Sequence, residues 1–252
     1  MKRALITGAS MGLGKAFAEI LSRDGWELVT VDRQPDGDDS VHGPAAVRFQ
    51  CDLSVPDEVA KLLEALKQGE GFDLAILNAG ASATGRFETI DPAVIPRLVH
   101  LNAFAPMALA TGLAGAGRLN AGSNLLFISS LSHFTGYPGA SVYAATKDAV
   151  AIYAKSIRKP FAAKGISVSC AFPGPLRTAH AERHAPKGAK AEKRMPPEEA
   201  AEKILTAALA GRKTIIPGFG PKLFSLAGRA FPAVTVRAMR RLIYDRLDRD
   251  VW

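Results

Sequence analysis

Cysteine is scarce in this chain, with only Cys51 and Cys170 among 252 residues. Two thiols are too few for a disulfide framework, and they stand at no metal-ligand spacing, so we expect no bound metal. Each lies within or beside a predicted strand, which favours buried thiols in a reducing compartment. We therefore expect a cytoplasmic protein.

Long apolar runs are also missing. No uninterrupted run reaches the roughly 18 residues that a membrane span needs. We expect no secretory signal, because the N-terminus leads directly into a predicted strand and a glycine-rich turn. Hydrophobic residues still make up 48% of the chain, enough for a sizeable core. We expect a single doubly wound α/β domain over residues 1–220.

The net charge of +8 is unevenly distributed. Residues 177–194 carry six Lys or Arg and two Glu, and residues 221–252 carry seven Lys or Arg and three Asp, so each segment contributes +4. The rest of the chain balances to zero. Because the excess is local and no recognised binding motif accompanies it, we expect no nucleic-acid partner.

A glycine-rich turn follows the first predicted strand, residues 3–7. Glycines between a strand and a helix let the backbone approach a pyrophosphate, and the helix N-terminus supplies free N–H groups. A turn that serves only helix–strand packing is the alternative. The candidate phosphate-binding residues are Gly8, Ser10, Met11, Gly12, Leu13 and Gly14.

The second predicted strand, residues 27–31, ends in Asp32 and Arg33. An acid at this place accepts hydrogen bonds from ribose hydroxyls and repels a 2′-phosphate, which favours NAD. Arg33 points the other way, because a guanidinium accommodates a 2′-phosphate. We expect NAD, with NADP as the alternative; a solvated strand end is the non-functional interpretation of both residues.

The chemistry is predicted in residues 124–161. A buried strand over residues 125–128 ends near Ser130, and Ser141 is a plausible N-cap of a helix that carries Tyr143 and Lys147, four residues apart. That spacing puts both side chains on one face. A nearby positive charge lowers the pKa of a phenol, ordinarily about 10, and so suits Tyr143 to acid–base work. An ordinary surface pair is the alternative.

The remaining elements connect these sites. We predict an exposed loop over residues 35–44, a third strand over 46–50, a helix that starts at Ser54, a fourth strand over 74–77 and a sixth over 166–172. Residues 179–195 are predicted to form a mobile solvated loop, in which His180 and His184 lack a third metal ligand.

The order of these motifs resembles that of the short-chain dehydrogenase/reductase family over residues 3–216. The resemblance implies that Ser130, Tyr143 and Lys147 are catalytic and that Asn102, on the helix after residue 90, holds a water that links Lys147 to solvent. From the residues alone, Asn102 would be a buried side chain satisfied by backbone. The resemblance also implies further cofactor contacts by Asp52, Leu53, Asn78, Ala79, Gly80, Pro173, Gly174 and Thr178, besides Tyr143 and Lys147.

The implied activity is reversible hydride transfer between NAD(P) and a small-molecule carbonyl or secondary alcohol, in a homo-oligomer, a dimer or tetramer. A non-catalytic nucleotide-binding sensor is one alternative. The basic, amphipathic residues 221–252 suggest two roles. Their apolar side covers the substrate site or a neighbouring subunit, or the segment lies on an anionic membrane surface, as in a reductase of a lipophilic substrate.

Overall fold

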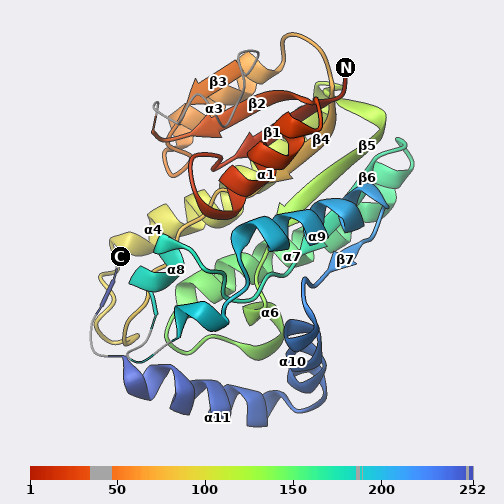
Figure 1. Ribbon diagram of the computed structural model, residues 1–252. Coiled ribbons are helices and arrows are strands. Elements are labelled where there is room, and N and C mark those ends of the chain that lie inside the picture. The colour runs from red at the N-terminus through yellow and green to blue at the C-terminus, as the bar shows by residue number, and fades with distance from the viewer. Residues whose placement is uncertain (35–46, 186–187, 189, 248–249, 252) are drawn as a thin grey trace.

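The structure is a computed structural model that describes residues 1–34, 47–185, 188, 190–247 and 250–251. Seven parallel strands form one sheet in the order β3-β2-β1-β4-β5-β6-β7 (Figure 1). This confirms the doubly wound α/β fold. The predicted loop over 35–44 lies outside the described residues. The strands are β1 (Arg3–Thr7), β2 (Glu27–Asp32), β3 (Val47–Gln50), β4 (Phe72–Leu77), β5 (Leu119–Ile128), β6 (Ser167–Ala171) and β7 (Thr214–Ile215).

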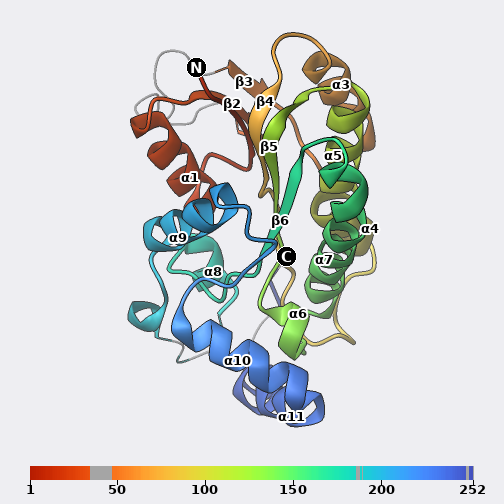
Figure 2. The ribbon, with the colours of Figure 1, turned by 90° about the vertical axis from the view of Figure 1, so that its right-hand side faces the viewer.

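Helices cover both faces of the sheet (Figure 2). Helices α1 and α9 pack together on one face, and α3, α5 and α7 lie on the other. Because both faces are covered, residues 4–6 of β1, 74–77 of β4 and 125–128 of β5 are continuous apolar runs rather than alternating ones. The helices are α1 (Gly12–Arg23), α3 (Pro56–Leu66), α4 (Val94–Val99), α5 (Ala105–Gly115), α6 (Ser132–Thr135), α7 (Ser141–Ala162), α8 (Ala179–Arg183), α9 (Pro197–Leu209), α10 (Phe219–Ala230) and α11 (Pro232–Leu242).

Successive strand residues enter the two cores in alternation. In β1, Leu5 packs with the residues of the α3–α5–α7 side, whereas its neighbours Ala4 and Ile6 pack with α1 and α9. In β4, Ala75 belongs to the first core and Ile76 to the second. This alternation is the two-residue period of a strand. It holds the sheet rigid between two apolar layers, so the strand ends are fixed supports for a site.

Two helices begin differently from the prediction. Helix α3 begins at Pro56 with Val55 at its N-cap, and Ser54 instead donates its hydroxyl to Asp52. Helix α7 begins at Ser141, so this serine is the first helical residue and Ala140 is the N-cap. In both cases the capping residue makes no side-chain hydrogen bond. A local serine signal is ambiguous because the hydroxyl also bonds within a preceding turn.

One long helix runs through α4, a π-helical segment over His100–Phe104, and α5. At 22 residues, Val94–Gly115 is long and apolar enough to cross a membrane by length and composition, but such a test is also passed by core helices. Here Leu98, Leu109 and Leu113 are buried in the protein. The segment is therefore weak support for a membrane span.

The C-terminal helices α10 and α11 lie beyond the carboxyl ends of the strands (Figures 1 and 2). α10 begins at Phe219, two residues before the predicted boundary. Gly228 allows α10 to approach α6 closely, since a Cβ atom there would meet the carbonyl oxygen of Phe134. The last described residues return to the domain, where Val251 pairs with Thr84.

Candidate active site

The sheet reverses its strand order between β1 and β4, and the glycine turn lies at this point. Open α/β sheets bind ligands where such a reversal occurs, beyond the strand ends. Gly8 has φ +70°, and a Cβ there would lie 2.9 Å from the Cα of Ala79. A Cβ on Gly14 would overlap the carbonyl oxygen of Gly8. These two glycines are thus required by packing itself, as the alternative interpretation of the turn proposed.

Gly12 differs from its neighbours in the turn. Its φ is +54°, and a Cβ there would meet only the side chain of Thr178, at 3.3 Å. Thr178 caps α8 and accepts a hydrogen bond from the N–H of Ala181, at 3.1 Å. The structure therefore brings together the start of α1 and the segment after β6. Gly12 leaves the N-terminus of α1 without a side chain on the side that faces Thr178, which fits a bound pyrophosphate.

Hydrogen bonds of Thr7 and Asn78 join the carboxyl end of β4 to the carboxyl end of β1. The backbone N–H groups of Asn78 and Ala79 both donate to Thr7 Oγ1, at 3.0 and 3.1 Å. Asn78 Nδ2 donates to the carbonyl oxygens of Thr7 and Gly8, each at 3.1 Å. Sequence reasoning missed Thr7; a polar residue at the end of an apolar strand was the available signal.

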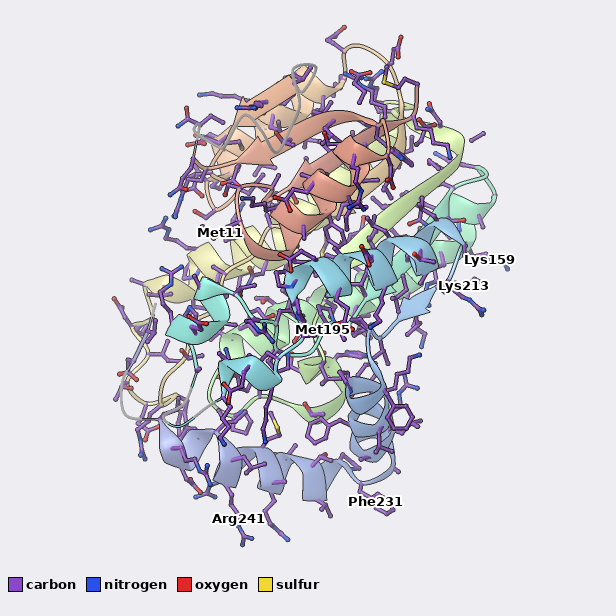
Figure 3. All side chains as sticks on the ribbon, in the orientation of Figure 1. Met11, Lys159, Met195, Lys213, Phe231 and Arg241 are labelled. Atoms are coloured by element: carbon purple, nitrogen blue, oxygen red, sulfur yellow. The ribbon has the colours of Figure 1, made fainter. Side chains whose placement is uncertain are left out.

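Asp32 lies against the glycine turn. Its Oδ2 accepts the backbone N–H of Ser10 at 3.0 Å, and its Oδ1 accepts that of Gln34 at 3.3 Å. Arg33 is exposed beside it, and Met11, the N-cap of α1, is half exposed and labelled in Figure 3. The carboxylate thus supports the turn while standing at the end of β2.

Asp52 and Leu53 have different surroundings. Both the N–H and the hydroxyl of Ser54 donate to Asp52 Oδ1, at 2.9 and 2.6 Å. Burial acts to raise the pKa of Asp52, but these bonds and the charges of Arg97 and Arg33 outweigh it, and the net pKa is lowered. Asp52 therefore stabilises the turn that leads into α3. The Leu53 side chain is buried in the core, so any adenine contact of Leu53 would come from its backbone.

The three predicted catalytic residues converge. Ser130 follows the end of β5, and its hydroxyl lies close enough to the Tyr143 phenol to act on the pKa of that phenol. The ammonium of Lys147 lies 5.8 Å from the centre of the Tyr143 ring and donates to the carbonyl oxygen of Ile128 at 2.9 Å. The buried Ser129, which the sequence did not single out, holds the lysine backbone through its hydroxyl, 2.8 Å from the Lys147 carbonyl oxygen.

The direction of the Tyr143 pKa corrects the expectation from sequence. Burial raises the pKa of Tyr143 above its ordinary value, and the Ser130 hydroxyl only partly offsets this. Burial also lowers the pKa of Lys147 to about 8. The reason is desolvation, which disfavours both the phenolate and the ammonium. A sequence shows the spacing of two side chains but not how much water remains around them.

Asn102 is almost fully buried in the π-helical segment, and both ends of its amide are used. Its Oδ1 accepts the N–H of Ala81 at 2.9 Å, and its Nδ2 donates to the Ala81 carbonyl at 2.8 Å and to Thr146 Oγ1 at 3.1 Å. The structure thus matches the backbone-satisfied interpretation. Pro106 lacks the N–H that would reach the carbonyl four residues earlier, and Ala105 donates to His100 across the wider turn. Asn102 lies within this distorted turn.

Gly80 brings Asn102 and Lys147 together. A Cβ at Gly80 would lie 2.9 Å from the ammonium nitrogen of Lys147 and 3.1 Å from Asn102 Oδ1. The loop after β4 therefore comes close to both polar groups. Because Gly80 has no side chain, its backbone can lie next to both groups and limits where the lysine ammonium can go.

The segment after β6 contains structure that the sequence did not predict. Residues 179–183 form α8, in place of a continuous loop. The rings of His180 and His184 lie 4.5 Å apart, and His184 Nδ1 hydrogen-bonds with Thr84 Oγ1. Burial lowers the pKa of His180, with further lowering by Arg183 and Lys147. In the described residues no group of three His, Cys, Asp or Glu is placed to hold a metal.

Pro173 and Gly174 connect β6 to this segment. The Leu131 N–H donates to the Pro173 carbonyl at 3.0 Å, which joins the loop after β6 to the residue next to Ser130. A Cβ on Gly174 would contact Pro221 at 3.4 Å. This loop therefore lies between the predicted catalytic serine and the C-terminal helices.

Known proteins are similar to this chain in sequence. The family model for short chain dehydrogenases matches residues 2–188. YmfI of Bacillus subtilis, an uncharacterized oxidoreductase, is 30% identical over 185 residues, which cover 70% of this chain and 76% of that protein. The protein FixR of Bradyrhizobium diazoefficiens is 32% identical over 189 residues, with 70% and 68% covered.

A solved structure is also similar to this chain. A short-chain dehydrogenase from Sphingobium yanoikuyae in complex with NADPH is 26% identical, with a TM-score of 0.77 over 93% of this chain and 96% of that one. The chain belongs to the short-chain dehydrogenase family, a family of oxidoreductases.

Proposed function

We propose that this protein is an NAD(P)-dependent oxidoreductase that transfers a hydride reversibly between nicotinamide and the carbon of a small carbonyl or secondary alcohol. The observation that carries the proposal is the convergence of a strand-end hydroxyl and a buried ammonium on one phenol, Tyr143. The NADPH complex of the Sphingobium yanoikuyae relative supports the cofactor class.

The chain's own groups would hold and move the proton. The N–H of Ser132 donates to Ser130 Oγ at 3.2 Å, so the serine O–H remains a donor for a substrate oxygen. Tyr143 passes the proton to or from that oxygen. Lys147 and Asn102 complete the proton path. The dinucleotide, when bound, supplies or accepts the hydride.

The electrostatics favour one direction at neutral pH. Because burial raises the pKa of Tyr143, its phenol is protonated and ready to donate. A protonated phenol suits reduction of a carbonyl, in which the oxygen gains a proton. Oxidation of an alcohol needs the phenolate and would become faster at higher pH.

The cofactor would lie along the carboxyl ends of β1, β2, β4 and β6. Gly12 and the start of α1 support the pyrophosphate, and Asp32 favours NAD over NADP by accepting from ribose hydroxyls. Arg33 keeps NADP as the alternative. The other proposed contacts are Gly8, Ser10, Met11, Leu13, Gly14, Asp52, Leu53, Asn78, Ala79, Gly80, Tyr143, Lys147, Pro173, Gly174 and Thr178.

We also propose a cytoplasmic homo-oligomer. Both cysteines are buried and free of disulfides, which suits a reducing compartment. Val99, Phe104 and Ile152 are exposed apolar side chains on helices that pack together. A second copy of the chain would cover them.

The test compares Tyr143→Phe with Tyr153→Phe. The control removes a phenol of the same helix that bonds Thr111 at 2.8 Å, away from the site. Turnover is measured with NADH and NADPH over a panel of carbonyls and alcohols. Tyr143→Phe should lower turnover at least about 100-fold while cofactor affinity is kept, and the control should retain turnover. Unchanged turnover in Tyr143→Phe rejects the assignment, and cofactor binding without turnover in the natural chain favours the sensor.

A further inference from the structure

Helix α10 exposes an apolar stripe. Phe219, Leu223 and Leu226 are spaced by four and three residues and therefore share one face. Phe219 is 82% exposed and Leu223 60% exposed. The opposite face, with Ser225 and Gly228, packs against α6. A surface helix ordinarily turns its apolar stripe inward, so the outward stripe of α10 lacks the core contact that such a stripe usually has.

The stripe continues into α11 and joins a basic face there. Phe231, 64% exposed, and Val234 extend the apolar residues across the corner between the helices. Arg237, Arg240 and Arg241 are exposed on α11. Figure 3 labels Phe231 and Arg241, which both project from the outer side of the helix pair, away from the sheet. We call these residues of α10 and α11 the tail surface.

The charge of the tail surface indicates what binds to it. Residues 219–247 carry six Lys or Arg against one Asp. A second copy that met this surface about a two-fold axis would bring like charges together. Interfacial helices that lie on anionic lipid combine exposed large apolar residues with Arg and Lys, as the tail surface does. We propose that the tail surface docks on an anionic lipid bilayer, with the apolar side chains in the headgroup region.

The docked position places the bilayer near the proposed active site. Ile243 and Leu247 approach Gly139, where a Cβ would lie 3.2 and 2.9 Å from them. Gly139 belongs to the turn that joins Ser130 to Tyr143. A bilayer under the tail surface would thus adjoin this turn. The docking does not depend on the proposed oxidoreductase activity, because it uses other residues and is measured by binding.

Sedimentation of the full chain with vesicles tests the proposal. One set of vesicles contains phosphatidylcholine with about 30% phosphatidylserine, and the other contains phosphatidylcholine alone. The chain should sediment with the anionic vesicles only, and salt should weaken this binding. Each basic residue at such a surface contributes about fivefold to binding. Arg237→Glu with Arg241→Glu should therefore weaken it by about 25-fold or more.

Two further double variants separate the apolar contribution from general effects. Leu223→Ser with Leu226→Ser should also weaken vesicle binding, and as exposed substitutions both tail variants should keep the natural unfolding midpoint. The charge control is Lys155→Glu with Lys159→Glu on α7, and Figure 3 shows Lys159 far from the tail surface. The proposal is overturned if anionic vesicles do not bind the chain or if the control loses as much binding. It is also overturned if the leucine variant changes the oligomeric state while vesicle binding stays unchanged.

Discussion

Replacement of Lys147 by methionine should change how stability depends on pH. The side chain is 4% exposed, and its pKa is lowered from 10.5 to about 8 by burial. The shift corresponds to about 3 kcal/mol of free energy that a charged Lys147 costs the folded state. Methionine has a similar length and carries no charge, so Lys147→Met removes this cost.

The sign of this pH dependence follows from the number of protons that the folded and unfolded chains bind. Between about pH 8 and about pH 10.5 the unfolded chain holds a proton on Lys147 that the folded chain has released, so the free energy of unfolding rises with pH. From about pH 7 to about pH 9.5 the natural chain should gain about 2 kcal/mol relative to Lys147→Met. Lys147→Met also loses the hydrogen bond to the Ile128 carbonyl. This loss changes the difference in unfolding free energy between the two proteins by a roughly constant amount across the pH range. The buried thiols of Cys51 and Cys170 titrate in both proteins and cancel.

Urea denaturation at the two pH values measures this difference, because the free energy of unfolding extrapolates linearly to water. Lys155→Met is the control, since Lys155 is exposed on the same helix, and its difference from the natural chain should stay constant. If the Lys147→Met difference is as flat as that of the control, burial does not disfavour the Lys147 charge, and the electrostatic reasoning for the site fails.

Two substitutions test how the site is positioned and which cofactor it prefers. Gly80→Ala would place a methyl group 2.9 Å from the Lys147 ammonium, and we expect about 1 kcal/mol of destabilisation and a turnover loss of about tenfold or more. Gly115→Ala, where a Cβ would meet nothing within 4 Å, should keep turnover; an equal loss in both would contradict the positioning role. Asp32→Asn removes the charge but keeps an acceptor, and the affinity ratio of NADH to NADPH should fall about tenfold or more. Titration of both cofactors measures it, with the exposed Asp24→Asn as control, and an unchanged ratio would show that Asp32 does not discriminate.

Several features were predictable because they are local in the sequence. The apolar runs of β1, β4 and β5 and the glycine turn between β1 and α1 appear where composition and periodicity predict them. Parallel strands place their carboxyl ends on one edge of a sheet, so residues that follow those runs were expected to meet. The convergence of Ser130, Tyr143 and Lys147 follows from this edge and from the four-residue spacing on α7.

Other features depended on contacts between distant residues. The sequence predicted that Lys147 would lower the Tyr143 pKa, but burial raises it. It suggested Ser141 as an N-cap, but α7 already includes that residue. Neither the link from Thr7 to Asn78 nor the π-helical turn that contains Asn102 was predicted. The burial of Tyr143 and the link from Thr7 to Asn78 are set by partners far along the chain.

The sequence by itself determined the order of the strands along the chain, the family and the residue types at the strand ends, since all of these appear as short local patterns. Only the tertiary structure decided which way the pKa of Tyr143 moves, which face of α10 is left outside, and how Gly80 brings Lys147 and Asn102 together. The physical reason is that desolvation and close packing depend on everything that surrounds a group, and those neighbours come from many parts of the chain.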